Sequence, residues 1–146
     1  MMRTDLSARA KTTKPCSLVL FSIGGRRFAA RIEEVGGVWP WPQAIPIPSQ
    51  TPFIRSVVRH GDTLLPVFEL AEQLQVSLKG DAPFCLVAKH EKGLLAIYID
   101  EEVPSLYQVD ASSLTPSQGT DTHCIGICQI DMEDVPVYSF ARIGAT

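Results

Sequence analysis

The chain has 146 residues and a mass of 16.0 kDa, which limits it to one ordinary domain or two very small ones and excludes a large multidomain enzyme. Hydrophobic residues make up 45% and charged residues 20%, so the chain can bury a core and is not expected to be disordered. The formal charge of -3 and the pI near 5.5, without a block of like charges, argue against nucleic acid or an anionic membrane as the partner.

The apolar runs and the N-terminal segment bear on localisation. The longest apolar runs, LLPVF and LLAIYI, are far shorter than the ~20 residues of a membrane span, so we predict no insertion into a membrane. The first 15 residues carry four basic side chains but no apolar stretch of the kind that a secretory signal requires. We expect residues 1–15 to be a flexible tail, residues 16–146 to be the folded part, and the protein to be cytoplasmic.

Four pairs of β-branched or aromatic runs, each pair separated by a short turn, predict four β-hairpins. In chain order they cover residues 16–32 with a turn at Gly24-Gly25, residues 53–68 with a turn at His60-Gly61-Asp62, residues 84–100 with a turn at Glu91-Lys92-Gly93, and residues 124–140 with an acidic turn at 131–134. Prolines between Pro40 and Pro52 predict a long extended loop after the first hairpin. A short helix is expected over Phe68–Leu74, and single turns over 32–35 and 100–103.

The two halves of the chain look like copies of each other. A shift of 68 residues superposes Leu18-Val19 on Leu86-Val87, Gly25 on Gly93 and Glu33-Glu34-Val35 on Glu101-Glu102-Val103, and a shift of 70 superposes Pro66-Val67-Phe68 on Pro136-Val137-Tyr138. Each copy carries about five short strands, which lose their exposed edges if they curl into a barrel. We therefore predict an all-β fold of two pseudo-symmetric five-stranded β-barrels with one or two short helices. The first barrel spans about 16–75 and the second about 80–140, with strands free to cross between them, and Val67 and Val137 are equivalent inward positions.

The four cysteines, Cys16, Cys85, Cys124 and Cys128, fit reduced thiols better than disulfides, because a chain of this size and hydrophobicity needs no covalent staples. Cys124 and Cys128 are predicted to lie on one face of a strand, about 13 Å apart, which is too far for a disulfide or a shared zinc ion. His123 would point to the opposite face. We predict neither a metal nor a cofactor.

No spacing typical of an active site is found. Gly24-Gly25-Arg26 lacks the GK[ST] end of a phosphate loop and opens a strand instead of a helix. A binding module is therefore a better hypothesis than an enzyme, although a thiol- or metal-dependent enzyme on a β scaffold is the alternative from another class. The remaining candidates are best explained as ordinary surface groups: His60, His90, His123 and the acidic pairs Glu33-Glu34 and Glu101-Glu102.

The segments FSIGGRRFAARIEEV, RHGDTLLPVFEL and GLLAIYIDEEV, in this order, resemble the CheW-like domain, an adaptor of bacterial chemosensory arrays. The resemblance covers nearly the whole chain after residue 16, and LPVFEL with an arginine and a glycine upstream is its most specific part. It implies two pseudo-twofold-related five-stranded barrels and a non-enzymatic role that couples the cytoplasmic tip of a chemoreceptor to the regulatory domain of a CheA-type histidine kinase, a domain of the same fold. The alternative is a divergent CheW-like scaffold of another array, for twitching motility or development, with a different partner.

The resemblance also implies a protein-binding site at the central hairpin. It assigns contact with the receptor tip to Arg59, with His60 and Gly61 in the same turn, and it places Val35 and Val38 on a segment that flanks the same groove. A guanidinium at this position can form a bidentate pair with a partner carboxylate, or a weak surface bridge with the neighbouring Asp62.

The chain departs from the family pattern at three places. Arg55 and Ser56 stand where glycine is usual, and His60 separates Arg59 from Gly61, which predicts a turn one residue longer. Trp39-Pro40-Trp41-Pro42 is also unlike a typical member, and it predicts either a separate docking patch or a lid packed over the first barrel.

Overall fold

The structure, a computed structural model, describes residues 15–40, 43–115 and 124–141. The predicted tail therefore lies outside the described residues, except for Pro15, which begins the first strand. Trp41 and His123 lie outside them as well.

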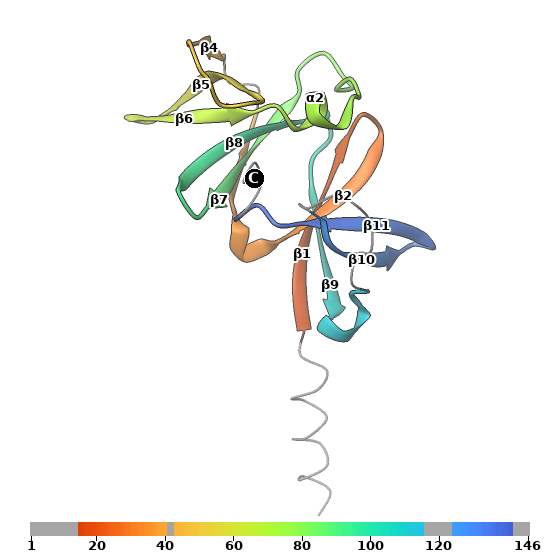
Figure 1. Cartoon of the computed structure of the whole chain (residues 1–146). Coiled ribbons are helices and arrows are strands. Elements are labelled where there is room, and N and C mark those ends of the chain that lie inside the picture. The colour runs from red at the N-terminus through yellow and green to blue at the C-terminus, as the bar shows by residue number, and fades with distance from the viewer. Residues whose placement is uncertain (1–14, 41–42, 116–123, 142–146) are drawn as a thin grey trace, which may run out of the picture.

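The described chain is built mainly of strands, arranged in two sheets that form barrel-like halves (Figure 1), and this confirms the predicted all-β two-barrel fold. The sheet that we call the terminal barrel has the order β10-β11-β2-β1-β9, with β1 (Pro15–Ile23), β2 (Arg26–Arg31), β9 (Ser105–Asp110), β10 (Cys124–Ile130) and β11 (Glu133–Tyr138). The sheet that we call the central barrel has the order β3-β7-β8-β6-β5-β4, with β3 (Val35–Trp39), β4 (Ile45–Pro46), β5 (Ile54–His60), β6 (Thr63–Phe68), β7 (Phe84–His90) and β8 (Gly93–Ile99).

The barrels do not follow one another along the chain. In Figure 1 the red and orange strands β1 and β2 lie beside the teal strand β9 and the blue strand β11, while the strands between them in sequence form the other half. The predicted division into a first barrel over 16–75 and a second over 80–140 is therefore wrong, because the first hairpin pairs with the last third of the chain. The crossing of strands, which the prediction allowed, is what occurs. The central sheet also has a sixth strand, because the two-residue β4 forms within the proline-rich loop and pairs with β5.

All four predicted hairpins are present as antiparallel pairs. The first turn shows why local sequence identified them: Gly24 and Gly25 both have positive φ, 65° and 82°, which glycine adopts at little cost. A Cβ on Gly24 would lie 2.7 Å from Cβ of Val76, so this turn also needs glycine for space.

Short helical elements lie between the strands. The helix α2 (Leu70–Leu74) falls within the predicted helical range, with Leu70 buried against the core. A 3₁₀ turn over Ile32–Glu34 confirms the single turn expected there, and a second one covers Ala111–Ser113. Residues 100–103, by contrast, form bends and no helical turn, because their carboxylates bind backbone amides of other segments.

Buried side chains form three clusters, one inside each barrel and one between them. The inter-barrel cluster gathers Phe21, Ile23, Phe28, Ala30, Phe68, Leu70, Leu86, Ala88, Leu95, Ile97, Ile99, Tyr138 and Phe140. Val67 lies in the central-barrel cluster and Val137 in the terminal-barrel cluster, and both are fully buried. Val67 pairs in parallel with Ala96, as Val137 does with Ala29, which confirms that the two valines are equivalent inward positions.

The same pairing corrects the repeat in the first hairpin. Since Ala29 and Ala96 are equivalent, 67 positions apart, Leu18 corresponds to Cys85 and not to Leu86. A one-residue slip moves a strand residue to the opposite face, and Leu86 indeed lies in the inter-barrel cluster whereas Leu18 lies inside the terminal barrel.

The cysteines are free thiols, as predicted, but Cys124 and Cys128 do not share a face. A β-bulge between Cys124 and Gly126 shifts the register of β10. Cys124 consequently packs against the inter-barrel cluster, and Cys128 lies inside the terminal barrel.

Carboxylates fasten the connections between the barrels. Asp100, only 4% exposed, accepts backbone hydrogen bonds from Gly24 and Gly25 in the first turn and from Lys79 before β7, at 2.8–2.9 Å. Glu34 accepts a hydrogen bond of 2.6 Å from the N–H of Phe140. Glu101, next to Asp100 in the sequence, accepts a hydrogen bond from the N–H of Asp81. Glu34 and Glu101 thus have structural roles, which corrects the interpretation of the acidic pairs as ordinary surface groups.

Candidate protein-binding surface

The five predicted site residues fall into two groups in the structure. Val35 and Val38 lie on β3, where Val35 packs against the inter-barrel cluster and Val38, 40% exposed, stands directly opposite Leu86 of that cluster. Because directly opposite residues share a face of the sheet, Val38 is on the inter-barrel side. The second group, Arg59, His60 and Gly61, lies at the exposed end of β5 and in the turn that follows it.

The central turn is shorter than predicted. His60 pairs with Thr63 and so belongs to β5, which leaves a two-residue turn of Gly61 and Asp62. Gly61 has φ 59°, the left-handed conformation that such turns require. Arg59 stands opposite Leu64, and among the described residues it forms no ion pair with Asp62.

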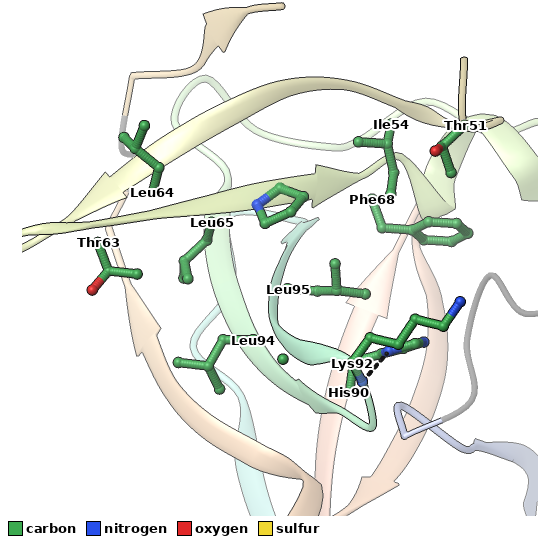
Figure 2. Close-up of a pocket in the computed structure, with 12 residues that line it drawn as sticks. Thr51, Ile54, Thr63, Leu64, Leu65, Phe68, His90, Lys92, Leu94 and Leu95 are labelled. Atoms are coloured by element: carbon green, nitrogen blue, oxygen red, sulfur yellow. Dashed lines mark hydrogen bonds between the residues drawn. The ribbon is translucent and has the colours of Figure 1, made fainter. Parts of the chain in front are cut away.

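An apolar groove of about 500 Å³ opens beside Leu64, between the β5–β6 and β7–β8 hairpins. It forms because the parallel strands β6 and β8 pair at their ends, through Val67–Ala96 and Phe68–Ile97, and diverge toward their beginnings. Figure 2 shows Leu65 and Leu95 within this opening, with Leu64 and Leu94 on one side and His90 and Lys92 on the other. Leu64 is 58% and Leu94 40% exposed, so the rim is apolar and one end carries a cation.

The terminal barrel provides an internal comparison, because β2 and β11 pair there as β8 and β6 do. By the same equivalence, Leu64 corresponds to Asp134 and Leu94 to Arg27. Arg27 also lies 3.6 Å from Asp131 and 3.5 Å from Glu133. Charged groups therefore occupy the positions at which the central barrel exposes leucine, and this asymmetry identifies the groove as the better candidate for a docking surface.

Sequence reasoning missed Leu64 and Leu94, although a signal was present. Each is the first of two adjacent leucines in the apolar runs LLPVF and LLAIYI. Since successive side chains of a strand point to opposite faces, the two leucines of each pair cannot both be buried on one face of the sheet. Leu65 and Leu95 are buried, and their neighbours form the apolar rim.

Trp39 packs as the lid interpretation predicts, whereas Trp41 and Pro42 of the same segment lie outside the described residues. The side chain of Trp39 packs against the central-barrel cluster, and its ring stacks on His60 with centroids 3.7 Å apart and an angle of 19° between the planes. The lid covers the barrel formed by residues 35–99, which is not the barrel over 16–75 that the sequence predicted.

The described residues show no arrangement typical of metal binding or thiol catalysis. Within residues 15–40, 43–115 and 124–141, no group of three His, Cys, Asp or Glu side chains is placed to hold a metal ion. Burial raises the pKa of the Cys85 thiol to about 12, so this cysteine is a poor nucleophile at neutral pH. The helices of the described residues are too short or too polar to cross a bilayer.

Comparisons with known proteins agree with the fold. Residues 17–143 match the family model of the CheW-like domain. No curated protein sequence matches the chain. Among solved structures, the scaffolding protein TtCheW from Thermoanaerobacter tengcongensis superposes with a TM-score of 0.74 at 18% sequence identity, over 85% of this chain and 88% of that one. At this identity the structural match supports the fold alone.

Proposed function

Because the chain belongs to the CheW-like domain family, whose members are non-enzymatic scaffolding proteins, we propose that it is a chemosensory signalling adaptor. It acts in the cytoplasm, where it couples the cytoplasmic tip of a chemoreceptor to the regulatory domain of a CheA-type histidine kinase. The work is done by surface recognition, with no cofactor.

The apolar groove of the central barrel is the observation that carries this proposal. Exposed leucines on the rim of an opening would be removed from water by a partner, which favours association. The resemblance to the CheW-like domain implies that the kinase regulatory domain has the same fold as this chain. We therefore assign the groove, with Leu64 and Leu94 on its rim, to the kinase domain.

The second partner needs a second surface. Val38 is partly exposed on the inter-barrel side of β3, and Val35 of the same strand packs against the inter-barrel cluster. We assign this strand to the receptor tip. The family resemblance assigns Arg59 as a further receptor contact. Arg59 lies between the two surfaces: it stands opposite Leu64 of the groove rim, and the next residue, His60, stacks on Trp39 of β3.

Binding of the purified regulatory domain, measured by isothermal titration calorimetry, tests the assignment of the groove. Leu64→Asp places a charge on the rim and should weaken binding at least about 30-fold, as expected for an interface hot spot. Met132→Asp is the matched control, because Met132 is 94% exposed at a hairpin tip of the terminal barrel. Unchanged affinity of a folded Leu64→Asp protein would overturn the assignment.

The receptor contact is tested separately. Arg59→Glu should abolish recruitment by a receptor tip and leave the melting temperature nearly unchanged, and Val38→Asp should have a weaker effect. Normal recruitment by the folded Arg59→Glu protein would favour the alternative, a scaffold of another signalling array with a different partner.

A further inference from the structure

The stack of Trp39 on His60 connects parts of the central sheet that backbone pairing leaves apart. In the described sheet order, β3 is one edge and pairs with β7, whereas β5 lies next to the opposite edge, β4. The two rings are 3.7 Å apart and nearly parallel, which is close stacking contact. The stack therefore closes the central barrel between β3 and the end of β5.

The terminal barrel closes differently at the equivalent place. His60 precedes the β5–β6 turn as Ile130 precedes the β10–β11 turn, and Ile130 is fully buried in the terminal core. An imidazole at the mouth of the central barrel contributes less apolar burial than isoleucine would. In exchange, the imidazole of His60 offers a flat face to the indole of Trp39, and that indole is itself fixed by packing against the central-barrel cluster.

The stack has a consequence for the residue before it. Neighbouring side chains of a strand point to opposite faces, so a His60 side chain held against Trp39 directs Arg59 outward, onto the face that it shares with Leu64. The two-residue turn that follows has few contacts of its own, since a Cβ on Gly61 would meet nothing within 4 Å. Besides its pairing with β6, the end of β5 is therefore held in its direction by the stack.

We propose that the Trp39–His60 stack is a positioning clamp that holds the end of β5 against β3 and thereby sets the direction of Arg59. This inference rests on the proposed function for the role of Arg59 as a partner contact. His60 and Trp39 are then positioning residues that act through Arg59, and the clamp makes the spacing between the groove and β3 a fixed property of the central barrel.

Three substitutions separate the clamp from general stabilisation. His60→Ala removes the stack and should weaken receptor-tip binding about three- to tenfold, the range expected for loss of an aromatic pair. His60→Phe preserves a flat ring and should restore wild-type affinity. Asp62→Ala changes the same turn without touching the stack and should bind as wild type.

A double-mutant cycle provides the decisive readout. If His60 acts through Arg59, the Arg59→Ala, His60→Ala double variant should bind no more weakly than Arg59→Ala alone, because the direction of a missing guanidinium cannot matter. Additive losses would overturn the proposal, as would failure of His60→Phe to restore binding by a protein that melts like the wild type.

A partner-independent measurement keeps this test separate from the proposed function. Backbone ¹⁵N relaxation should show lower order parameters for residues 59–63 in His60→Ala and wild-type values in His60→Phe. Unchanged order in His60→Ala would refute the clamp whatever the partner is. If the wild-type protein binds no receptor tip but the order parameters respond as stated, the proposed function fails and the structural part of the clamp stands.

Discussion

Asp100 is the residue whose replacement best tests how the two barrels are held together. One oxygen of its carboxylate accepts hydrogen bonds from the backbone N–H groups of Gly24, at 2.9 Å, and Lys79, at 2.8 Å, and the other accepts one from Gly25, at 2.8 Å. Since the side chain is 4% exposed, water cannot easily replace these bonds. A single carboxylate therefore joins a turn of the terminal barrel to the segment that enters β7 of the central barrel.

The expected losses follow from the number of bonds removed. A hydrogen bond to a charged group contributes roughly 1.5–3 kcal/mol, and partial entry of water reduces the sum, so Asp100→Ala should cost about 3–5 kcal/mol. Asp100→Asn can keep its oxygen toward Gly24 and Lys79 but turns an amide donor toward Gly25, so it should cost about 1.5–3 kcal/mol. Glu101→Ala is the control: its carboxylate is exposed and should contribute at most about 1 kcal/mol.

Thermal unfolding followed by circular dichroism measures the series. For a domain of this size, 1 kcal/mol corresponds to about 3 °C, so Asp100→Ala should melt roughly 10–15 °C below the wild type. The order of losses should be Asp100→Ala, then Asp100→Asn, then Glu101→Ala. A melting temperature of Asp100→Ala within about 2 °C of the wild type, or an equal loss in Glu101→Ala, would refute the reasoning.

Three further predictions concern burial and charge. Val67→Asp and Val137→Asp should each lower the free energy of unfolding by about 3–5 kcal/mol in urea titrations, since each buries an unpaired charge in one barrel, and a wild-type midpoint for both would contradict their inward placement. Burial, then repulsion by Glu72, raises the pKa of Glu69, so its contribution to stability is present at acidic pH and is lost as pH rises past the ordinary glutamate range. Glu69→Gln should therefore gain stability relative to the wild type at pH 7 but not at pH 4, and an equal effect at both would contradict this. Under native conditions at pH 8, iodoacetamide should alkylate Cys85 about tenfold or more slowly than a partly exposed cysteine, measured by mass spectrometry, and equal rates would show that the central barrel opens readily.

Local patterns in the sequence were sufficient for the hairpins and for α2. Each hairpin has its own turn residues between two apolar runs, so no distant contact is needed to identify it. Val67 and Val137 could be matched because Pro-Val-aromatic recurs in both halves. The family resemblance assigned a receptor contact to Arg59, which lies near the exposed end of β5 in the structure, and the contact itself stays a prediction.

Long-range pairing was beyond the same reasoning. The parallel contact of Ala29 with Val137 joins residues that are far apart in sequence, and nothing in either strand encodes its partner. The alignment of Val35 with Val103 did not predict equal burial, for a related reason. Val35 packs against the inter-barrel cluster, whereas Val103 is 76% exposed. Whether an aligned residue is buried depends on the sheet that its strand joins. Asp100 gave no signal either, because its three donors come from two distant segments.

The central claim, that one chain binds two partners through two surfaces, is tested most directly by forming the ternary complex. Size-exclusion chromatography with light scattering should show the chain, a receptor tip and the kinase regulatory domain in one complex. Leu64→Asp should lose the kinase domain and retain the receptor tip, because the groove and β3 are separate surfaces. Competition between the two partners for the wild-type chain, or loss of both from a folded Leu64→Asp protein, would contradict the account.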